Sequence, residues 1–136
     1  MSDSTRHYRV AIAQEFLRHI GHGDPGQAIE LLSPNVTYRT EGNNALAGLF
    51  TGRDAVVGHL MAVVERTKGT YETFKWEDWM VGEHNVVGLG VVHAQANGKI
   101  FRGRTLTLVA FNVSDEIEGI TVFFEDPSGI DRFIGP

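Results

Sequence analysis

Residues 20–64 constrain the fold of this chain more than any other segment, because helix-ending and helix-starting signals follow one another closely there. Gly21 and Gly23 end a first helix, since glycine readily adopts the left-handed conformation of a helix C-cap. The sequence Asp-Pro-Gly-Gln at residues 24–27 has the form of a capping box and starts a second helix. Ser33-Pro34 ends that helix, because the residue before a proline avoids the helical conformation.

A strand and a third helix complete this segment. Residues 35–40 are predicted to form a strand, and a loop rich in Gly, Asn and Ala follows it. Gly52-Arg53-Asp54-Ala55-Val56 then opens a helix that runs to about Thr67 and carries an apolar stripe at helical spacing. The first half of the chain therefore contains three helices and one strand.

From Thr70 onward the pattern changes to long strands rich in Val, Thr, Phe and Trp. Asn97-Gly98 predicts a two-residue hairpin turn, because both residues tolerate a positive φ. Helices first and an antiparallel meander last predict an α+β fold, in which a curved antiparallel sheet packs on three N-terminal helices around a cone-shaped hollow. We expect a single domain over residues 1–136, with strands at 71–81, 86–96, 99–113 and 116–125.

Composition excludes several kinds of function. The chain has no cysteine for a thiolate metal site, and its net charge of −5 argues against nucleic-acid binding, which needs a basic face. His19, His22 and His59 are interpreted as structural, since a catalytic metal usually needs three protein ligands. No signal peptide is visible at residues 1–6, and no apolar stretch approaches the roughly 18 residues of a membrane span. We expect a cytoplasmic protein that uses no cofactor or metal and binds neither nucleic acid nor membrane.

Four short motifs carry a resemblance to a known group of proteins. They are Gly23-Asp24, Leu31 to Val36, Gly48 with Gly52 to Val56, and the closing Ile117 to Pro127. In this order they resemble the nuclear transport factor 2-like superfamily, and the SnoaL-like branch most. That superfamily also contains ketosteroid isomerases and limonene-epoxide hydrolases. The resemblance implies a cone-shaped, cystatin-like fold with a deep apolar pocket and a homodimer.

The residues of ketosteroid isomerases do not carry over to this chain. The resemblance places their tyrosine oxyanion donor at Phe16, their proton-shuttling aspartate near Thr40 and their second oxyanion acid at Thr107. A phenyl ring and threonine side chains supply neither the strong donor nor the base that enolisation needs. Steroid isomerisation is therefore not expected.

Limonene-epoxide hydrolases fit only in part. Their Arg and two Asp residues match Val91, His93 and Val122, whereas their water-orienting tyrosine matches Tyr38. Without a carboxylate pair, His93 and Tyr38 remain as candidate catalytic residues. Imidazole suits proton transfer near neutral pH, and a phenol can orient a ligand oxygen. Each residue also has a structural interpretation. His93 could be a half-buried histidine that is hydrogen-bonded to a neighbouring strand, and Tyr38 could be an aromatic residue that fills the core.

Further side chains are assigned by strand alternation. Trp76 and Trp79 are expected on opposite faces of their strand, so that only one lines the pocket, and Asp78 could be a base on an apolar face or a solvated carboxylate. Glu125 or Asp126 could match the catalytic acid of the cyclases, although a helix cap before Pro127 is the favoured interpretation. The expected pocket is lined by Phe16, Thr40, Val63, Trp76, Val91, Thr105, Thr107, Ile120, Val122 and Phe124.

The sequence leaves three functions open. The first is an isomerase, cyclase or hydrolase that works on a small apolar ligand by general acid–base catalysis. The second is a non-catalytic module that binds such a ligand in the same pocket. The third is a dimerisation module that uses an apolar outer sheet face formed by Leu106, Leu108 and Ala110.

Overall fold

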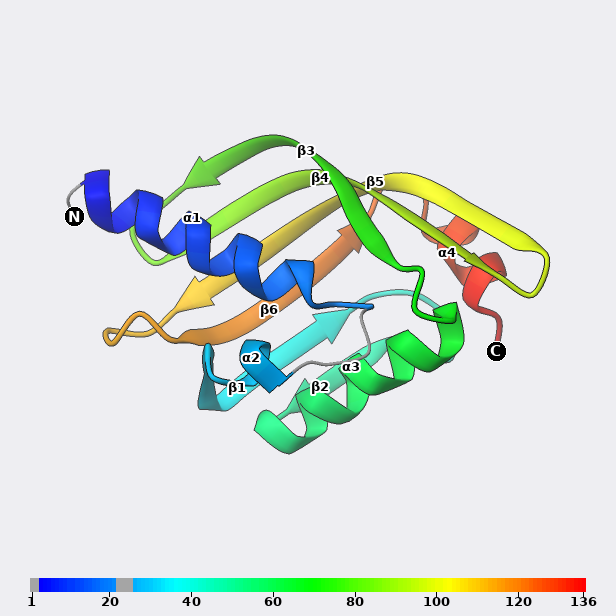
Figure 1. The fold of residues 1–136 in the computed structure, drawn as a ribbon, viewed down its shortest axis with the longest axis horizontal. Helices are drawn as coiled ribbons and strands as arrows, with labels where there is room; N and C mark the ends of the chain where they lie inside the picture. Colours follow the sequence, from blue (N-terminus) through cyan, green and yellow to red (C-terminus); the bar gives the residue numbers. More distant parts are fainter. Residues whose placement is uncertain (1–2, 22–25) are drawn as a thin grey trace.

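The structure is a computed structural model that describes residues 3–21 and 26–136. Figure 1 shows helices and one curved sheet wrapped around a common interior. In chain order the elements are α1 (Asp3–Arg18), α2 (Gly26–Ile29), β1 (Leu32–Thr40), β2 (Gly48–Thr51), α3 (Arg53–Thr67), β3 (Glu72–Val81), β4 (Asn85–Ala96), β5 (Lys99–Phe111), β6 (Ile117–Phe124) and α4 (Pro127–Ile134). The α+β class and the cone-like architecture expected from the sequence are confirmed.

The strands form one mixed sheet in the order β2-β1-β6-β5-β4-β3. The pairs β3–β4, β4–β5, β5–β6 and β1–β2 are antiparallel, as expected for a meander and a hairpin. The pair β1–β6 is parallel, so the prediction of a wholly antiparallel sheet is wrong at this one place. The two strands come from opposite ends of the chain, and local sequence signals do not reveal such a pairing.

The first half of the chain departs most from the sequence-based prediction. α2 covers only residues 26–29, and residues 32–34 begin β1 instead of ending a helix. Leu32 pairs with Ile117 and is fully buried, and the pairing register shifts between Leu32 and Thr37, which lets Pro34 lie within a strand. The expected loop after β1 contains the short strand β2. The helix-start signals at residues 22–25 lie outside the described residues.

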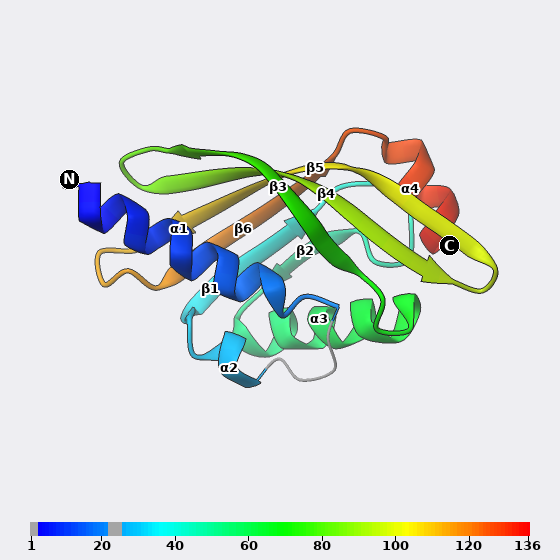
Figure 2. The same ribbon diagram turned by 45° about the horizontal axis from the view of Figure 1, so that its top comes forward.

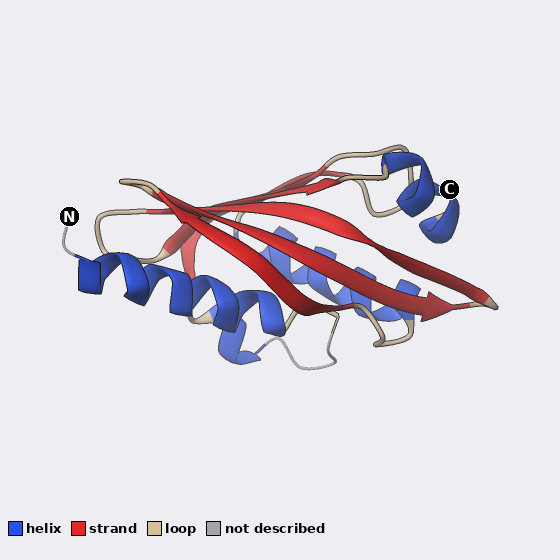
Figure 3. Ribbon diagram, turned by 90° about the horizontal axis from the view of Figure 1, so that it is seen from above, coloured by secondary structure: helices blue, strands red, loops and turns tan. Residues whose placement is uncertain are grey.

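Helices α1 and α3 lie on the same, concave side of the sheet (Figures 2 and 3). Their apolar faces meet the sheet in one buried cluster to which α1 contributes Phe16 and Leu17 and α3 contributes Val56 and Leu60. None of the described helices covers the convex side, and none is both long and apolar enough to cross a membrane. The interior between the concave face and the helices is therefore where an internal site could form.

Two irregularities in β3 change which side chains face inward. The pairing of β3 with β4 shifts between Thr73 and Lys75 and again between Trp76 and Asp78. As a result, Trp76 and Trp79 both pack against the core, with ring centroids 4.7 Å apart. The prediction that they lie on opposite faces is wrong, because it assumed uninterrupted alternation. Asp78 is exposed and accepts a hydrogen bond from the backbone N–H of Trp79 (2.8 Å), so it is not a buried base.

Two glycines of β4 make room for these rings. A Cβ on Gly88 would lie 2.7 Å from Cζ3 of Trp76 and 2.8 Å from Cη2 of Trp79. A Cβ on Gly90 would lie 2.9 Å from Cε3 of Trp76. The glycines therefore permit close approach of the tryptophans, which lie beside the irregular pairing of β3 with β4.

Candidate functional site

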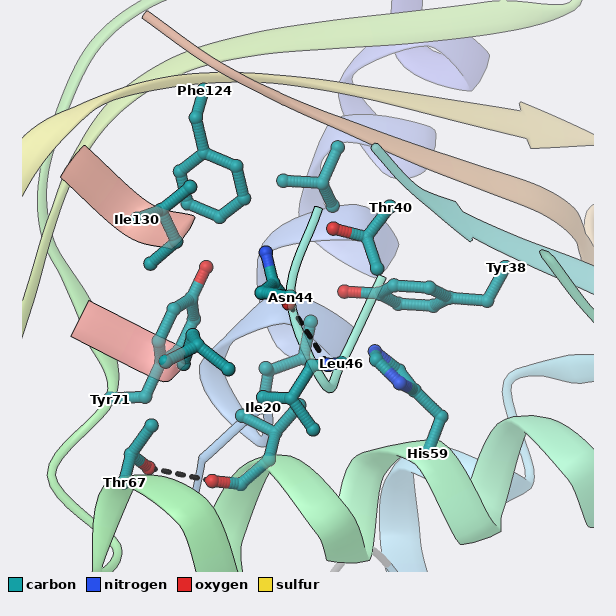
Figure 4. Close-up of a pocket in the computed structure, with 13 residues that line it drawn as sticks. Ile20, Tyr38, Thr40, Asn44, Leu46, His59, Thr67, Tyr71, Phe124 and Ile130 are labelled. Carbon is teal, nitrogen blue, oxygen red and sulfur yellow. Dashed lines mark hydrogen bonds between the residues drawn. The ribbon is translucent and has the colours of Figure 1, made fainter. Parts of the chain in front are cut away.

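A small cavity lies between the concave face of the sheet, α3 and α4 (Figure 4). Its volume is about 30 Å³, which is room for about two water molecules. None of the described side chains around it is Asp, Glu, Lys or Arg. The cavity is lined by Ile20, Tyr38, Thr40, Asn44, Leu46, His59, Val63, Thr67, Tyr71, Val122, Phe124, Ile130 and Ile134.

His59 projects into this region from the inner stripe of α3. It follows Val56 by three residues and precedes Val63 by four, so helical spacing places all three on the buried face. Its ring lies between those of Phe50 and Tyr38, with centroids 4.3 Å and 4.6 Å away. The residue is 4% exposed, and its Nδ1 has no hydrogen-bond partner among the described residues. Burial lowers the pKa of His59 to about 4, so the imidazole is neutral at pH 7.

Two phenols approach the cavity from different walls. Tyr38, on β1, is 3% exposed, and Tyr71 lies just before β3. Figure 4 shows the hydroxyl of Tyr38 beside Thr40 and the hydroxyl of Tyr71 beside Ile130, on the opposite side of the space. Burial raises the pKa of each phenol above its ordinary value, and the nearby Tyr71 raises the pKa of Tyr38 further. Both phenols therefore stay protonated and can donate a hydrogen bond.

Two other polar residues at the cavity, Asn44 and Thr67, already have hydrogen bonds within the described chain. Asn44 donates from Nδ2 to Oδ1 of Asp131 (2.7 Å) and accepts at Oδ1 from the backbone N–H of Leu46 (2.9 Å). The hydroxyl of Thr67 donates to the carbonyl of Val63 at 2.7 Å. The hydroxyls of Tyr38, Thr40 and Tyr71 and the ring nitrogens of His59 have no hydrogen bond to the part of the chain that the structure describes. These are the groups that could bind a ligand.

The expected pocket residues fall into three groups. Five line the cavity, namely Tyr38, Thr40, Val63, Val122 and Phe124. A second group lies in the surrounding interior without lining the cavity, and it comprises Phe16, Trp76, Thr105, Thr107 and Ile120.

Val91 and His93 form the third group, and their expected place in the pocket is corrected. Along β4 the residues with even numbers, such as Val92, are buried, whereas Val91 and His93 are half-buried on the opposite face. His93 pairs with Glu72 of β3 and with Arg102 of β5, and neither Val91 nor His93 lines the cavity. Alternation correctly put Val91 and His93 on one face, but that face is the convex one. The Tyr38–His93 pair therefore does not form.

The acidic pair after β6 has a structural role at Asp126. Its Oδ1 accepts a hydrogen bond from the backbone N–H of Gly129 (3.0 Å) and caps α4, which confirms the favoured interpretation. The side chain of Glu125 is exposed and lies 3.9 Å from the guanidinium of Arg104. Neither carboxylate reaches the cavity.

Sequence reasoning missed His59 and Tyr71 as site residues. The spacing of His59 relative to Val56 and Val63 is a signal that could have placed it on the buried face of its helix. Tyr71 gives no comparable signal, because it lies in a connection between α3 and β3.

Comparison with known proteins supports the fold. No protein-family model and no curated protein sequence matches the chain. Among solved structures, a protein of unknown function with a cystatin-like fold from Xanthomonas campestris is 24% identical, with a TM-score of 0.85 over 94% of this chain and 98% of that one. Bal32a, from a soil-derived mobile gene cassette, is 19% identical with a TM-score of 0.86 over 96% and 98%. A putative SnoaL-like polyketide cyclase from Jannaschia sp. CCS1 is 12% identical with a TM-score of 0.80 over 100% and 98%.

These likenesses define the class. The chain has the cystatin-like α+β fold, and two further neighbours are described as NTF2-like proteins. The resemblance to the nuclear transport factor 2-like superfamily, and to its SnoaL-like members, is confirmed at the level of the fold.

Proposed function

We propose that this chain binds a small uncharged molecule in the cavity beside Tyr38 and His59. The observation that carries the proposal is the group of polar atoms on Tyr38, His59 and Tyr71 that have no hydrogen bond to the described chain. Of these atoms Nδ1 of His59 is itself fully buried, and a buried polar atom without a partner costs about 1–3 kcal/mol. Proteins seldom leave such groups unpaired, so a ligand or ordered water is the expected partner.

The walls of the cavity favour a neutral ligand. With no Asp, Glu, Lys or Arg among the described lining residues, an ionised ligand would have no counter-charge. Burying an unpaired ion costs several kcal/mol even after the protein relaxes. Ile20, Val63 and Phe124 offer apolar contact instead. The ligand therefore combines an apolar body with one or two polar atoms that face the phenols and His59.

Binding fits the properties of these groups better than proton transfer. A general base works best when its pKa is near the working pH, and His59, with a pKa of about 4, is a weak base. Raised pKa values make Tyr38 and Tyr71 weak acids. Neutral imidazole and phenol nevertheless make good hydrogen-bond partners for a ligand oxygen.

Acid–base catalysis without a cofactor is the second candidate function. The contact between the rings of Tyr38 and His59 favours it, because two proton-carrying groups share one buried site. A neighbour in fold is described as a putative SnoaL-like polyketide cyclase. Under this alternative the chain is an isomerase, cyclase or hydrolase, in which a ligand oxygen would exchange a proton with His59.

A titration with matched probes tests the binding proposal. Cyclopentanone, cyclopentanecarboxylate and cyclopentylammonium have similar size but are neutral, anionic and cationic. Monitored by amide NMR, cyclopentanone is expected to shift residues around Tyr38 and His59 at about millimolar concentration, and the two ions are not. His59→Phe should weaken the interaction, whereas His84→Ala, at an exposed histidine, should not. Equal binding of the ions, or shifts elsewhere, would refute the proposal.

The same probe separates binding from catalysis. In D₂O, a protein that abstracts the α-protons of cyclopentanone accelerates their replacement by deuterium, which NMR detects directly. A binding module gives the background rate at every protein concentration. Acceleration by the wild-type protein that is lost in His59→Phe would favour catalysis.

We also propose that the convex face of the sheet forms a homodimer interface. Leu106, Leu108 and Ala110 are half-buried on this face, and Phe123 nearby is 41% exposed. A continuous apolar face that no described helix covers is typical of an interface. Sedimentation should give a dimer for the wild type and a monomer for Leu108→Asp, with cyclopentanone binding retained. A wild-type monomer would refute this proposal.

A further inference from the structure

Helix α4 forms one end of the cavity. Ile130 and Ile134 of this helix line it, together with Asn44 and Leu46 of the 41–47 segment between β1 and β2. The buried residues of α4 do not belong to the main core. They form a second cluster with the far halves of β4 and β5, made of Val92, Ala94, Ala96, Phe101, Ile130, Phe133 and Ile134.

Asp131 ties α4 to the 41–47 segment. Its Oδ1 accepts hydrogen bonds from the backbone N–H of Asn43 (2.9 Å) and from Nδ2 of Asn44 (2.7 Å). The backbone continues the connection, because Gly135 donates to the carbonyl of Asp131 (2.8 Å) and accepts from the N–H of Ala45 (2.9 Å). One carboxylate therefore joins the two sides of this end.

Gly42 allows this close approach. Its φ is +137°, a conformation that side chains rarely adopt, and a Cβ at this position would lie 2.7 Å from Oδ1 of Asp131. Any other residue at position 42 would therefore strain the backbone and displace the side chains of Asp131 and Asn44 from their present contact.

Two further side chains bond to the C-terminal half of α4. Arg66 of α3 donates from Nε to the carbonyl of Ile134 (3.1 Å), and Lys99 donates from Nζ to the carbonyl of Arg132 (3.1 Å). Water can replace such partly exposed hydrogen bonds at small cost. The buried residues of α4 belong to the second cluster, so separation of α4 from the 41–47 segment breaks few apolar contacts of the main core.

We infer that ligands enter the cavity between α4 and the 41–47 segment, and that Asp131 is the positioning residue that holds this entrance shut. The inference rests on the proposed binding function, since a cavity of about 30 Å³ must widen before it can hold a molecule larger than two waters. Separating Asn44 and Leu46 from Ile130 and Ile134 parts four of its lining residues at once. Asp131 itself does not line the cavity, so it acts on access and not on the bound ligand.

Amide hydrogen exchange of the wild-type protein is the first test. The N–H groups of Asn43, Ala45 and Gly135 should exchange together, faster than those of the sheet core such as Val109. In Asp131→Asn, which keeps an acceptor but loses its charge, their protection should fall about tenfold. Exchange of these amides only together with the sheet core would overturn the inference.

Ligand kinetics provide the second test. If the entrance controls access, Asp131→Asn should raise the association and dissociation rates of cyclopentanone by the same factor, about tenfold, and leave Kd unchanged. NMR line shapes give both rates. Glu125→Gln is the matched control, because it removes one exposed charge near α4 without touching the 41–47 segment, and it should change neither rate.

The outcomes separate this inference from the proposed function. A changed Kd with an unchanged association rate would mean that Asp131 acts on the bound ligand, and unchanged rates despite loosened amides would place the entrance elsewhere. Either result overturns the inference while binding stands. If cyclopentanone does not bind the wild type, the proposed function fails, and hydrogen exchange still decides whether α4 and the 41–47 segment open together.

Discussion

Protonation of His59 is expected to destabilise the fold in mild acid. The folded protein lowers the pKa of this imidazole from an ordinary 6.5 to about 4, because the ring is buried among Tyr38, Phe50 and apolar side chains. The unfolded chain thus binds a proton more tightly than the folded one. The contribution of neutral His59 to the free energy of unfolding is fully present above pH 6.5 and is lost as the pH falls from 6.5 toward 4.

The size of the effect follows from the two pKa values. Each unit of difference corresponds to about 1.4 kcal/mol, so the full difference of 2.5 units amounts to about 3 kcal/mol below pH 4. Between pH 7.5 and pH 5 the same linkage gives a loss of about 2 kcal/mol. His59 is 4% exposed, so solvent does not screen the ring. A domain of ordinary stability would lose a sizeable fraction of its free energy of unfolding.

Urea denaturation, monitored by the fluorescence of Trp76 and Trp79, measures this loss. Other carboxyl and imidazole groups also titrate, so the informative quantity is the difference between the wild type and His59→Phe at each pH. Phenylalanine keeps the contacts with Phe50 and Tyr38 but cannot take up a proton. The difference should move by about 2 kcal/mol in favour of the variant between pH 7.5 and pH 5.

A second variant tests whether the pH dependence of stability arises from the burial of His59. His84→Ala removes an exposed histidine and reports how much pH dependence follows from losing a histidine as such. If the wild-type and His59→Phe curves stay parallel from pH 7.5 to pH 5, the imidazole is not held neutral by burial. The assignment of His59 as an uncharged hydrogen-bonding group of the cavity would then be wrong.

Three further substitutions test other parts of the structure, each by urea denaturation. Gly88→Ala should cost about 2 kcal/mol, because its Cβ would overlap the two tryptophan rings, and an unchanged midpoint would contradict their placement. Tyr38→Phe should leave stability unchanged or raise it by up to about 1 kcal/mol, since its hydroxyl lacks a partner among the described residues, and a clear loss would reveal one. Asp115→Asn should cost about 1 kcal/mol by weakening the contact with buried Arg9 (2.9 Å), and a cost that does not shrink in high salt would argue against a charge effect.

The elements of the fold were predictable where one local signal governs each of them. The helix over residues 53–67 begins and ends at the residues that its glycine start and apolar stripe indicate, and the Asn97-Gly98 turn joins β4 and β5 as expected. Local signals failed at β2 and at the start of β1. There, pairing with distant strands decides the structure, as in the contact of Leu32 with Ile117.

The sequence correctly predicted those cavity residues that lie on a regular strand, two or four positions from a buried residue. Tyr38 and Thr40 follow the buried Val36 at intervals of two, and Val122 and Phe124 follow Ile120 in the same way. Alternation broke down at Trp79, because two bulges in β3 insert residues that no sequence pattern marks.

The error at His93 has a different cause, and it bears on the proposed dimer. Alternation identifies two faces of β4 but does not show which face is buried, and the resemblance to limonene-epoxide hydrolases indicated the wrong one. In β4 the inward face carries Gly88 and Gly90, whose space is filled by the tryptophans of β3, whereas the outward face carries Leu89 and Val91 beside His93. Judged by bulk, the outward face looks like the core. A strand that places its larger apolar side chains on the convex side is the pattern expected if a second copy of the chain covers that side.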